Sequence, residues 1–229
     1  MKPWQHRQWC LPEVGAEFVA AMEDVLDLYE EPYDPQYPTV CFDEKPVVLR
    51  AEARPGVPAA PGRPERRDYE YVREGTANLF VMTEPLAGWR HGEVTERRTK
   101  LDFAEAIRGL VEERYADAEY VRIVLDNLNT HGPAALYEAF PPEQARAIAT
   151  RVEFHHTPKH ASWLNMAEIE ISVFERGCLS RPVGDRATLE RRVATLEAER
   201  NAARCTIHWQ FTSRHARTKL ADLYPVKQT

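Results

Sequence analysis

The order in which two sequence patterns follow one another constrains the fold of this chain most. Four segments have the composition of strands and are separated by turn residues: 39–50, 69–74, 77–85 and 88–97. Helical periodicity then alternates with short apolar runs over residues 102–179. Strands joined by hairpin turns pair antiparallel, whereas strands joined through helices pair parallel. The chain therefore predicts an α/β fold whose mixed sheet, antiparallel strands first and parallel strands after them, is flanked by helices.

Local signals define some of these elements more closely. Residues 74–76 have turn composition and separate the second strand segment from the third. Pro46 has no amide hydrogen, so we expect the first strand to end or bulge before Val47. Asp102 is expected to cap a helix that covers residues 103–117. These signals divide the first half of the sheet into short strands.

The N-terminal part of the chain predicts an amphipathic helix. Over residues 12–31 apolar side chains recur at spacings of three and four, at Val14, Phe18, Met22, Val25 and Tyr29. The proline-rich stretch PYDPQYP follows directly and ends the helix, because proline cannot continue it.

Residues 51–67 form a proline-rich, basic segment. Prolines recur there at every third position, which predicts an extended polyproline-like loop. The segment carries four arginines: Arg54, Arg63, Arg66 and Arg67. A solvated linker and an arm that contacts DNA phosphates fit this composition equally well.

Bulk properties exclude several classes of protein. No run of about 18 apolar residues is present, so no transmembrane helix is expected, and the start lacks the apolar segment of a signal peptide. We therefore expect a cytoplasmic protein. The 4 cysteines have no metal-binding or disulfide spacing and are expected to be free thiols. A net charge of −6 argues against a surface that binds nucleic acid all over, although a local basic patch would suffice.

Three acidic residues are candidates for a shared metal site. Asp43 lies in the first strand segment, and Asp126 follows the apolar run at residues 121–125. Glu168 stands near the start of a predicted helix. If the two strands are neighbours, both aspartates lie at one edge of the sheet and the helix can bring Glu168 to them. Mg²⁺ prefers a few carboxylates together with substrate phosphate oxygens, so this grouping would suit it.

Each acid also has an ordinary structural interpretation. Asn165 and Glu168 have the spacing of a capping box, in which the glutamate serves only the helix backbone. Asp43 can belong to a strand-end ion pair with its charged neighbours, and Asp126 can belong to a plain turn. Taken singly, none of the three signals is specific.

Their combination resembles a known family. The blocks FDEK, VLDNLNTH and TPKHASWLNMAEIEIS resemble, in that order, the three catalytic blocks of DDE transposases. The match is to the mariner-like superfamily, in its bacterial insertion-sequence six-thirty branch. The resemblance implies an RNase H-like domain in which Asp43, Asp126 and Glu168 are catalytic and hold two Mg²⁺ ions, with Mn²⁺ able to substitute. Glu170 is the rival third acid, but it lies about 200° from Glu168 on a helix.

The resemblance also implies an activity and partners. The expected activity is metal-dependent cleavage of DNA at the ends of a mobile element, followed by strand transfer into target DNA. Double-stranded DNA is the expected partner, in the bacterial nucleoid, and a homodimer is expected because two ends must be joined. Residues 1–38 would be a linker-helix segment and residues 39–229 the catalytic domain. A separate chain would then supply a helix-turn-helix domain for end recognition.

Two other functions fit the same residues. One is a catalytically incompetent fragment that only binds DNA or dimerises, and the other is a general RNase H-like nuclease or resolvase.

The spacing of two of the acids departs from the family pattern. Asp126 and Glu168 are 42 positions apart, a longer separation than is usual in the superfamily. An insertion around residues 140–149 would account for the extra length.

Several further residues are candidates for DNA contact. Besides the arginines of residues 51–67, they are Lys45, Asn127, His131, His156 and Lys159. For the two lysines a solvated role is equally consistent with the sequence. Pro158 separates the nearby histidines, which excludes a helical zinc-binding pair. Trp163 is expected in the core rather than stacked on a base.

Overall fold

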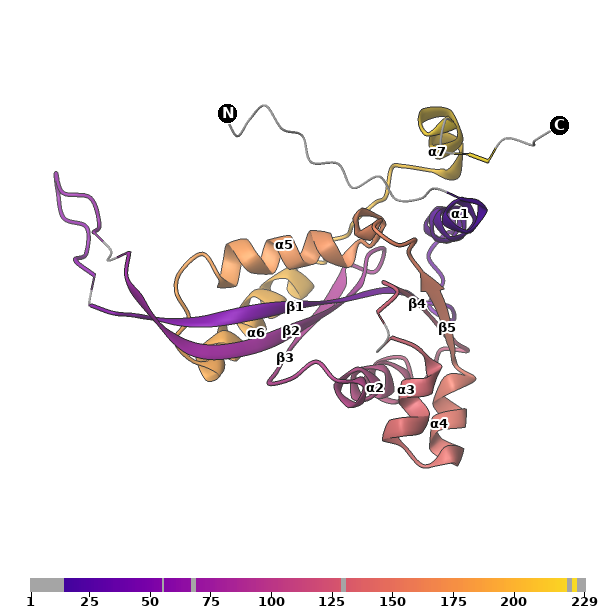
Figure 1. The fold of residues 1–229 in the computed structure, drawn as a ribbon, viewed down its shortest axis with the longest axis horizontal. Coiled ribbons are helices and arrows are strands. Elements are labelled where there is room, and N and C mark those ends of the chain that lie inside the picture. Colours follow the sequence, from indigo (N-terminus) through magenta and orange to yellow (C-terminus); the bar gives the residue numbers. More distant parts are fainter. Residues whose placement is uncertain (1–14, 55, 67–68, 129–130, 222–223, 226–229) are drawn as a thin grey trace.

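The computed structural model describes residues 15–54, 56–66, 69–128, 131–221 and 224–225. Its centre is a sheet of five strands in the order β3-β2-β1-β4-β5 (Figure 1). The strands are β1 (Thr39–Glu52), β2 (Tyr71–Glu84), β3 (Trp89–Thr95), β4 (Val121–Leu125) and β5 (Val152–His156). β1, β2 and β3 pair antiparallel, whereas β1, β4 and β5 pair parallel. The predicted mixed sheet is confirmed.

Helices cover both faces of this sheet (Figure 1). One face carries α2 (Lys100–Arg108), α3 (Pro133–Ala139) and α4 (Pro142–Ala149), which pack on Val40 and Phe42 of β1. The opposite face carries α1 (Ala16–Glu30), α5 (Ala167–Cys178) and α6 (Arg186–Ala202). Cys41 faces this second side, because successive side chains of a strand point to opposite faces. The sheet therefore separates the core on the α2–α4 side from two core clusters on the opposite side.

The remaining helical elements are short. A π-helical turn, η2 (Gly109–Arg114), continues α2, and a 3₁₀ turn, η3 (Ser162–Leu164), precedes α5. α7 (Ser213–Lys219) lies beside α1 (Figure 1). α4 occupies most of residues 140–149, the segment in which an insertion was predicted. In the described parts of the chain, no helix has the length and apolar character to cross a membrane.

The N-terminal helix agrees with its prediction in the described part. α1 begins at Ala16, and Met22 and Val25 are buried. Phe18 and Tyr29 pack at the margin of the same core. Val14 lies outside the described residues.

The prediction that Pro46 interrupts the first strand is wrong. β1 continues through Pro46, which pairs with Asn78 of β2. β4 pairs with β1 only as far as Cys41, so the other side of β1 is open at Pro46. Proline is tolerated there because no neighbouring strand on that side requires its amide hydrogen.

The turn predicted at residues 74–76 is also wrong, because β2 is one continuous strand. Gly75 has a φ of 111°, and the pairing of β1 with β2 shifts register between Leu49 and Arg50. These are the features of a β-bulge, in which glycine adopts a conformation that other residues rarely reach. Gly75 does mark an irregularity in the backbone, but the irregularity is a bulge within β2 and not a chain reversal.

Two smaller predictions need correction. In residues 56–66, a described part of the segment 51–67, the chain does not follow a polyproline path, because Val57 pairs with Arg66 and Ala60 with Arg63 in antiparallel bridges. The segment is therefore the narrow end of the β1–β2 hairpin, which projects from the body of the molecule (Figure 1). The cap of α2 is Thr99, with Asp102 as its capping-box partner, since Thr99 Oγ1 is positioned to accept from the Asp102 amide.

Candidate active site

Neighbouring parallel strands bring Asp43 and Asp126 to the same edge. β1 and β4 are in register, with Cys41 opposite Val124. Continuing this register by two positions brings Asp43 level with Asp126, which directly follows β4. Val124 and Cys41 belong to the core on the α5 side of the sheet, so the alternation of side chains directs both aspartates toward that side. The two strands are neighbours, which was the condition for the expected grouping of the two aspartates.

Asn165 fixes the start of α5 to the strand that carries Asp43. Its side-chain amide donates to the carbonyl oxygen of Phe42 (2.8 Å), and its Oδ1 accepts from the Ala167 amide (3.1 Å). Asn165 is 1% exposed, so water does not compete for these bonds. Glu168 lies in the first turn of α5 and is thereby held near Asp43.

The capping-box interpretation of Glu168 is not borne out by the hydrogen bonds. The backbone amide of Asn165 donates to the carbonyl of Ser162 (2.8 Å), not to a glutamate side chain. Within the described residues, the carboxylate of Glu168 has no hydrogen-bond or ion-pair partner, and the residue is partly exposed. Its oxygens are therefore available for another ligand.

Burial and the neighbouring acids both act on the pKa of Asp43. Burial raises this pKa most, and the negative charges of Glu168, Asp126 and Glu44 raise it further, to about 7. The Glu44 amide donates to Asp43 Oδ1 (2.8 Å) and opposes this rise only in part. Asp43 thus sits among carboxylates, and a cation bound beside it would favour its ionised form.

His131 joins Asp126 to Glu44. Its Nδ1 lies 2.7 Å from Asp126 Oδ1, and its Nε2 lies 2.9 Å from Glu44 Oε2. Burial lowers the pKa of His131, but the two carboxylates outweigh it and raise the pKa to about 9. Burial acts to raise the pKa of Asp126, yet the hydrogen bonds from His131 and from the Leu128 amide lower it overall. The imidazolium therefore keeps Asp126 ionised and fixes one of its oxygens.

The side chain of His131 is buried, a position that does not suit the DNA contact predicted for it. The His131 side chain is 1% exposed and packs edge-on against Phe42, with Phe103 beside it. His131 holds Asp126 from below the protein surface, so its imidazole cannot contact a ligand bound at that surface. Glu44, which the sequence offered only as a neighbour of Asp43, is the partner that completes this arrangement.

The three acids have the chemistry of a metal site but do not form a closed one. No three His, Cys, Asp or Glu side chains come close enough to enclose a metal ion as they lie, within the part of the chain that the structure describes. The donor set nevertheless fits Mg²⁺ or Mn²⁺, because it consists of carboxylate oxygens with unbalanced negative charge. The side chains would have to move for all three acids to ligate one ion.

Glu170 is part of a different structure. It is fully buried, and its carboxylate lies 3.3 Å from Arg90 Nη2 and 2.8 Å from Arg200 Nη2. Arg90 comes from β3 and Arg200 from α6, so the cluster joins three elements beneath α5. A carboxylate that is already shared by two guanidinium groups is a poor candidate for a metal ligand.

Two other candidates support the edge of the sheet near Asp126. The Asn127 side chain donates to the carbonyl of Thr157, and His156 Nδ1 lies 3.2 Å from the carbonyl oxygen of Asp126. These contacts join the ends of β4 and β5. Asn127 is exposed and His156 partly so, which leaves both within reach of a ligand at this edge.

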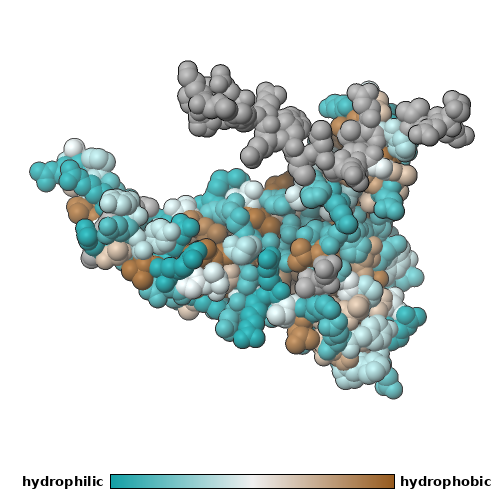
Figure 2. Space-filling model, in the orientation of Figure 1, coloured by the Kyte–Doolittle hydropathy of each residue, from teal (hydrophilic) through white to brown (hydrophobic). Residues whose placement is uncertain are grey.

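The basic candidates are spread over different surfaces. Lys45 is ion-paired with Glu175 of α5, and Lys159 is exposed after β5. Arg54, Arg63 and Arg66 are exposed on the hairpin end, far from the β4 edge (Figure 1), on a surface that is largely hydrophilic (Figure 2). Arg67 lies outside the described residues. Trp163 is 47% exposed, so its predicted place in the core is wrong.

The fold and the family can now be stated. The mixed sheet with helices on both faces is RNase H-like. A family model described as DDE superfamily endonuclease matches residues 38–190, which include all three acids. The chain belongs to this family.

Solved structures with the same fold are distant in sequence. A crystal structure of the Mos1 mariner paired-end complex with Mn is 14% identical, with a TM-score of 0.56 over 87% of this chain and 62% of that one. The Mos1 strand transfer complex is 12% identical, with a TM-score of 0.50 over 90% of this chain and 66% of that one. This chain thus spans less than two thirds of the length of either. No curated protein sequence matches it.

Proposed function

We propose that this chain is the catalytic domain of a DDE transposase. It cuts phosphodiester bonds at the ends of a mobile DNA element and joins the released 3′ ends to target DNA. Asp43, Asp126 and Glu168 are the catalytic acids and hold two Mg²⁺ ions, or Mn²⁺ in their place. The observation that carries the proposal is the pairing of β1 with β4, which brings Asp43 level with Asp126, together with the Asn165 contacts that hold the first turn of α5, and with it Glu168, to β1.

Each of the three acids has a defined contribution. Asp126 is kept ionised by His131, which occupies Oδ1 and leaves Oδ2 for a metal ion. Asp43 must lose its proton to ligate, and with its pKa at about 7 it does so near neutrality. Glu168 brings an uncommitted carboxylate on a helix that Asn165 anchors to β1. When bound, the ions supply the Lewis acidity that activates the attacking oxygen and stabilises the leaving one.

DNA is the proposed partner, in two forms. The element's ends and the target duplex would both approach the edge formed by the ends of β4 and β5, where Asn127, His156 and Lys159 are accessible. Arg54, Arg63 and Arg66 offer a second, separate set of phosphate contacts. A homodimer would hold two element ends, and a separate helix-turn-helix chain would recognise them. The solved Mos1 paired-end and strand transfer complexes support this part of the proposal by analogy of fold.

Nicking of supercoiled plasmid DNA tests the proposal. Purified protein should nick in Mg²⁺ or Mn²⁺ and not in EDTA, and Asp126→Asn or Glu168→Gln should reduce the rate on the order of a hundredfold or more. Glu153→Gln, which changes an exposed acid on β5, is the matched control and should nick like the wild type. Equal nicking by the wild type and Asp126→Asn would overturn the assignment of the site.

A second arm separates a transposase from a general nuclease. The same plasmid is compared with and without the terminal sequences of the element. Faster nicking of the plasmid that carries the ends supports transposition. Metal-dependent nicking at the same rate in both plasmids would instead identify a general RNase H-like nuclease that uses the same three acids.

A further inference from the structure

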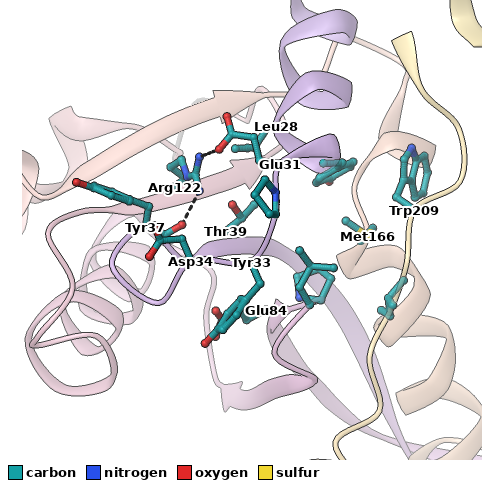
Figure 3. Close-up of a pocket in the computed structure, with 15 residues that line it drawn as sticks. Leu28, Glu31, Tyr33, Asp34, Tyr37, Thr39, Glu84, Arg122, Met166 and Trp209 are labelled. Carbon is teal, nitrogen blue, oxygen red and sulfur yellow. Dashed lines mark hydrogen bonds and ion pairs between the residues drawn. The ribbon is translucent and has the colours of Figure 1, made fainter. Parts of the chain in front are cut away.

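Aromatic rings from two distant parts of the chain meet beside the start of α5. Trp163 belongs to η3, the turn that leads into α5, whereas Trp209 and Phe211 belong to the segment between α6 and α7. Trp209 lines a pocket together with Met166, the residue directly before α5 (Figure 3). The rings therefore lie next to the beginning of the helix that carries Glu168.

The ring of Trp163 is held by its neighbours but is not covered by them. It stacks on Trp209, with ring centroids 6.5 Å apart and an angle of 20° between the planes. Phe211 meets it in a T-shaped contact at 5.8 Å. The residue is nonetheless 47% exposed. Because its neighbours already restrict the indole ring, a flat ligand can stack on it at little cost in side-chain freedom.

Basic side chains of α7 lie near these rings. Lys219 Nζ is 5.9 Å from the centroid of the Phe211 ring, and the ring of His215 lies 6.1 Å from the same centroid. Arg214 directly precedes His215, and both Arg214 and Lys219 are exposed. Within the described residues, neither of these two cations has an acidic partner. They are therefore available to a negatively charged ligand that contacts the rings.

The acids of α1 that contact α7 are already engaged. Glu23 accepts two hydrogen bonds from Arg217, each of 2.7 Å. Asp27 accepts from the Ser213 hydroxyl, and Glu30 accepts from the Ser213 amide. These contacts hold the carboxylates between the two helices, so they oppose a phosphate on the exposed side of α7 less than unpaired acids would.

This combination of rings and cations favours a single strand of DNA. We define Trp163, Phe211, Arg214 and Lys219 as the aromatic–basic patch. Unpaired bases have flat faces that stack on aromatic side chains, and the phosphates between them attract lysine and arginine. A base inside a duplex is already stacked on both sides, and an acidic peptide would use the cations without the rings. Unpaired nucleotides therefore suit the patch best.

We propose that the aromatic–basic patch binds unpaired DNA beside the catalytic acids. One base stacks on Trp163, and neighbouring phosphates pair with Arg214 and Lys219. The inference rests on the proposed function, because a strand whose end is cut and moved to a new partner must leave its base pairs near the cut. Trp163 is then a positioning residue, which holds the strand at η3, directly before the helix that carries Glu168.

Fluorescence anisotropy with labelled oligonucleotides tests the inference in EDTA, where the metal-dependent cleavage cannot occur. The probe is an oligothymidylate of about 12 nucleotides, and its matched control has the same phosphates with abasic sites in place of the bases. The wild type should bind the oligothymidylate saturably. It should bind the abasic control at least about fivefold more weakly, because base stacking on an aromatic side chain contributes at least that factor.

Variants connect the binding to the patch. Trp163→Ala should reduce the preference for bases to about twofold or less, whereas Trp163→Phe, which keeps an aromatic face, should retain most of it. Lys219→Gln removes a phosphate contact, so it should weaken binding of both oligonucleotides several-fold. Tyr137→Ala removes a similarly exposed aromatic residue from α3 on the other face of the sheet, and it should bind like the wild type. Circular dichroism establishes that each variant is folded.

Three results would each overturn the inference: no saturable binding of oligothymidylate, equal binding of the abasic control, or an unchanged preference for bases in folded Trp163→Ala. Plasmid nicking in Mg²⁺ separates this failure from failure of the proposed function. Nicking by a chain that shows no preference for bases refutes the patch alone. A preference that Trp163→Ala removes, in a chain that does not nick, refutes the proposed function alone.

Discussion

At the scale of single residues, two adjacent acids of β1 have opposite environments. Asp43 points to the α5 side and lies among carboxylates, which raise its pKa to about 7. Glu44 points to the other side and meets His131, whose ring nitrogen lies 2.9 Å away. The difference follows from the alternation of side chains along a strand. One acid is thereby left for a ligand, while its neighbour is used to position Asp126 through His131.

The raised pKa of Asp43 predicts that its charge destabilises the metal-free protein. The folded pKa of about 7 lies above the ordinary value of 3.8, so between these pH values the folded state retains a proton that the unfolded state releases. Stability should therefore fall as pH rises from about 4 to 7. Asp43→Asn removes this effect and should stabilise the protein in EDTA at pH ~8 by about 1–2 kcal/mol, with little change at pH ~4.

Urea unfolding in EDTA at the two pH values measures this effect. Asp117→Asn, at an exposed position, is the control and should change stability little at either pH. A destabilised Asp43→Asn variant at the higher pH would mean that the acids do not repel one another.

The pairing of His131 with Glu44 predicts a coupled effect on stability. His131→Gln removes the closer cation of buried Glu44 and leaves only Arg98, 3.9 Å away, so it should cost about 3–5 kcal/mol, since the His131 and Glu44 side chains are 1% and 5% exposed. The double variant with Glu44→Gln should recover part of this loss. A double-mutant cycle by urea unfolding should give a coupling energy of about 1–3 kcal/mol. Additive effects would show that the two residues do not interact.

At the scale of elements, the position of α5 decides whether a third acid reaches the other two. Asn165 holds its first turn to β1, and the buried cluster of Glu170 with Arg90 and Arg200 holds its underside to β3 and α6. Two positions along a helix correspond to about 200° of rotation, so Glu170 and Glu168 point to nearly opposite sides. The buried cluster therefore sets the rotation of α5 that directs Glu168 toward the site.

The two glutamates of α5 should give opposite results when substituted. Glu170→Gln should lower stability by about 3–5 kcal/mol, because it leaves a buried guanidinium poorly compensated. Glu168→Gln should leave stability nearly unchanged but weaken Mn²⁺ binding at least about tenfold. Unfolding curves and Mn²⁺ titrations followed by electron paramagnetic resonance measure both quantities. The reverse pattern would make Glu170 the metal ligand.

Asn165 should matter for ligand geometry as well as for stability. Asn165→Ala removes two buried hydrogen bonds and should cost about 1–3 kcal/mol. Because α5 then loses its connection to β1, Mn²⁺ affinity should also fall, by about tenfold. Ser162→Ala, at an exposed position just before, is the control. Wild-type Mn²⁺ affinity in a folded Asn165→Ala variant would contradict a positioning role.

At the scale of the whole molecule, the mixed sheet was predictable from the sequence, whereas the adjacency of β1 and β4 entered only as a condition. Apolar residues recur with a period of two in half-buried strands and of about 3.6 in amphipathic helices, so each element can be recognised from its own residues. Pro46 and Gly75 were misread because their effect depends on what lies beside the strand, which no local pattern reveals. The role of Glu44 and the placement of α5 could not be predicted from the sequence either. Both depend on partners far along the chain, namely His131, Arg90 and Arg200.

The most direct test is to locate Mn²⁺ by anomalous X-ray diffraction from crystals of the full chain grown with the ion. The account predicts anomalous density bound by carboxylate oxygens of Asp43 and Asp126, with Glu168 on the same or an adjacent ion. Manganese bound only elsewhere, or absent from between the two aspartates at saturating concentration, would contradict the claim that these acids form one metal centre.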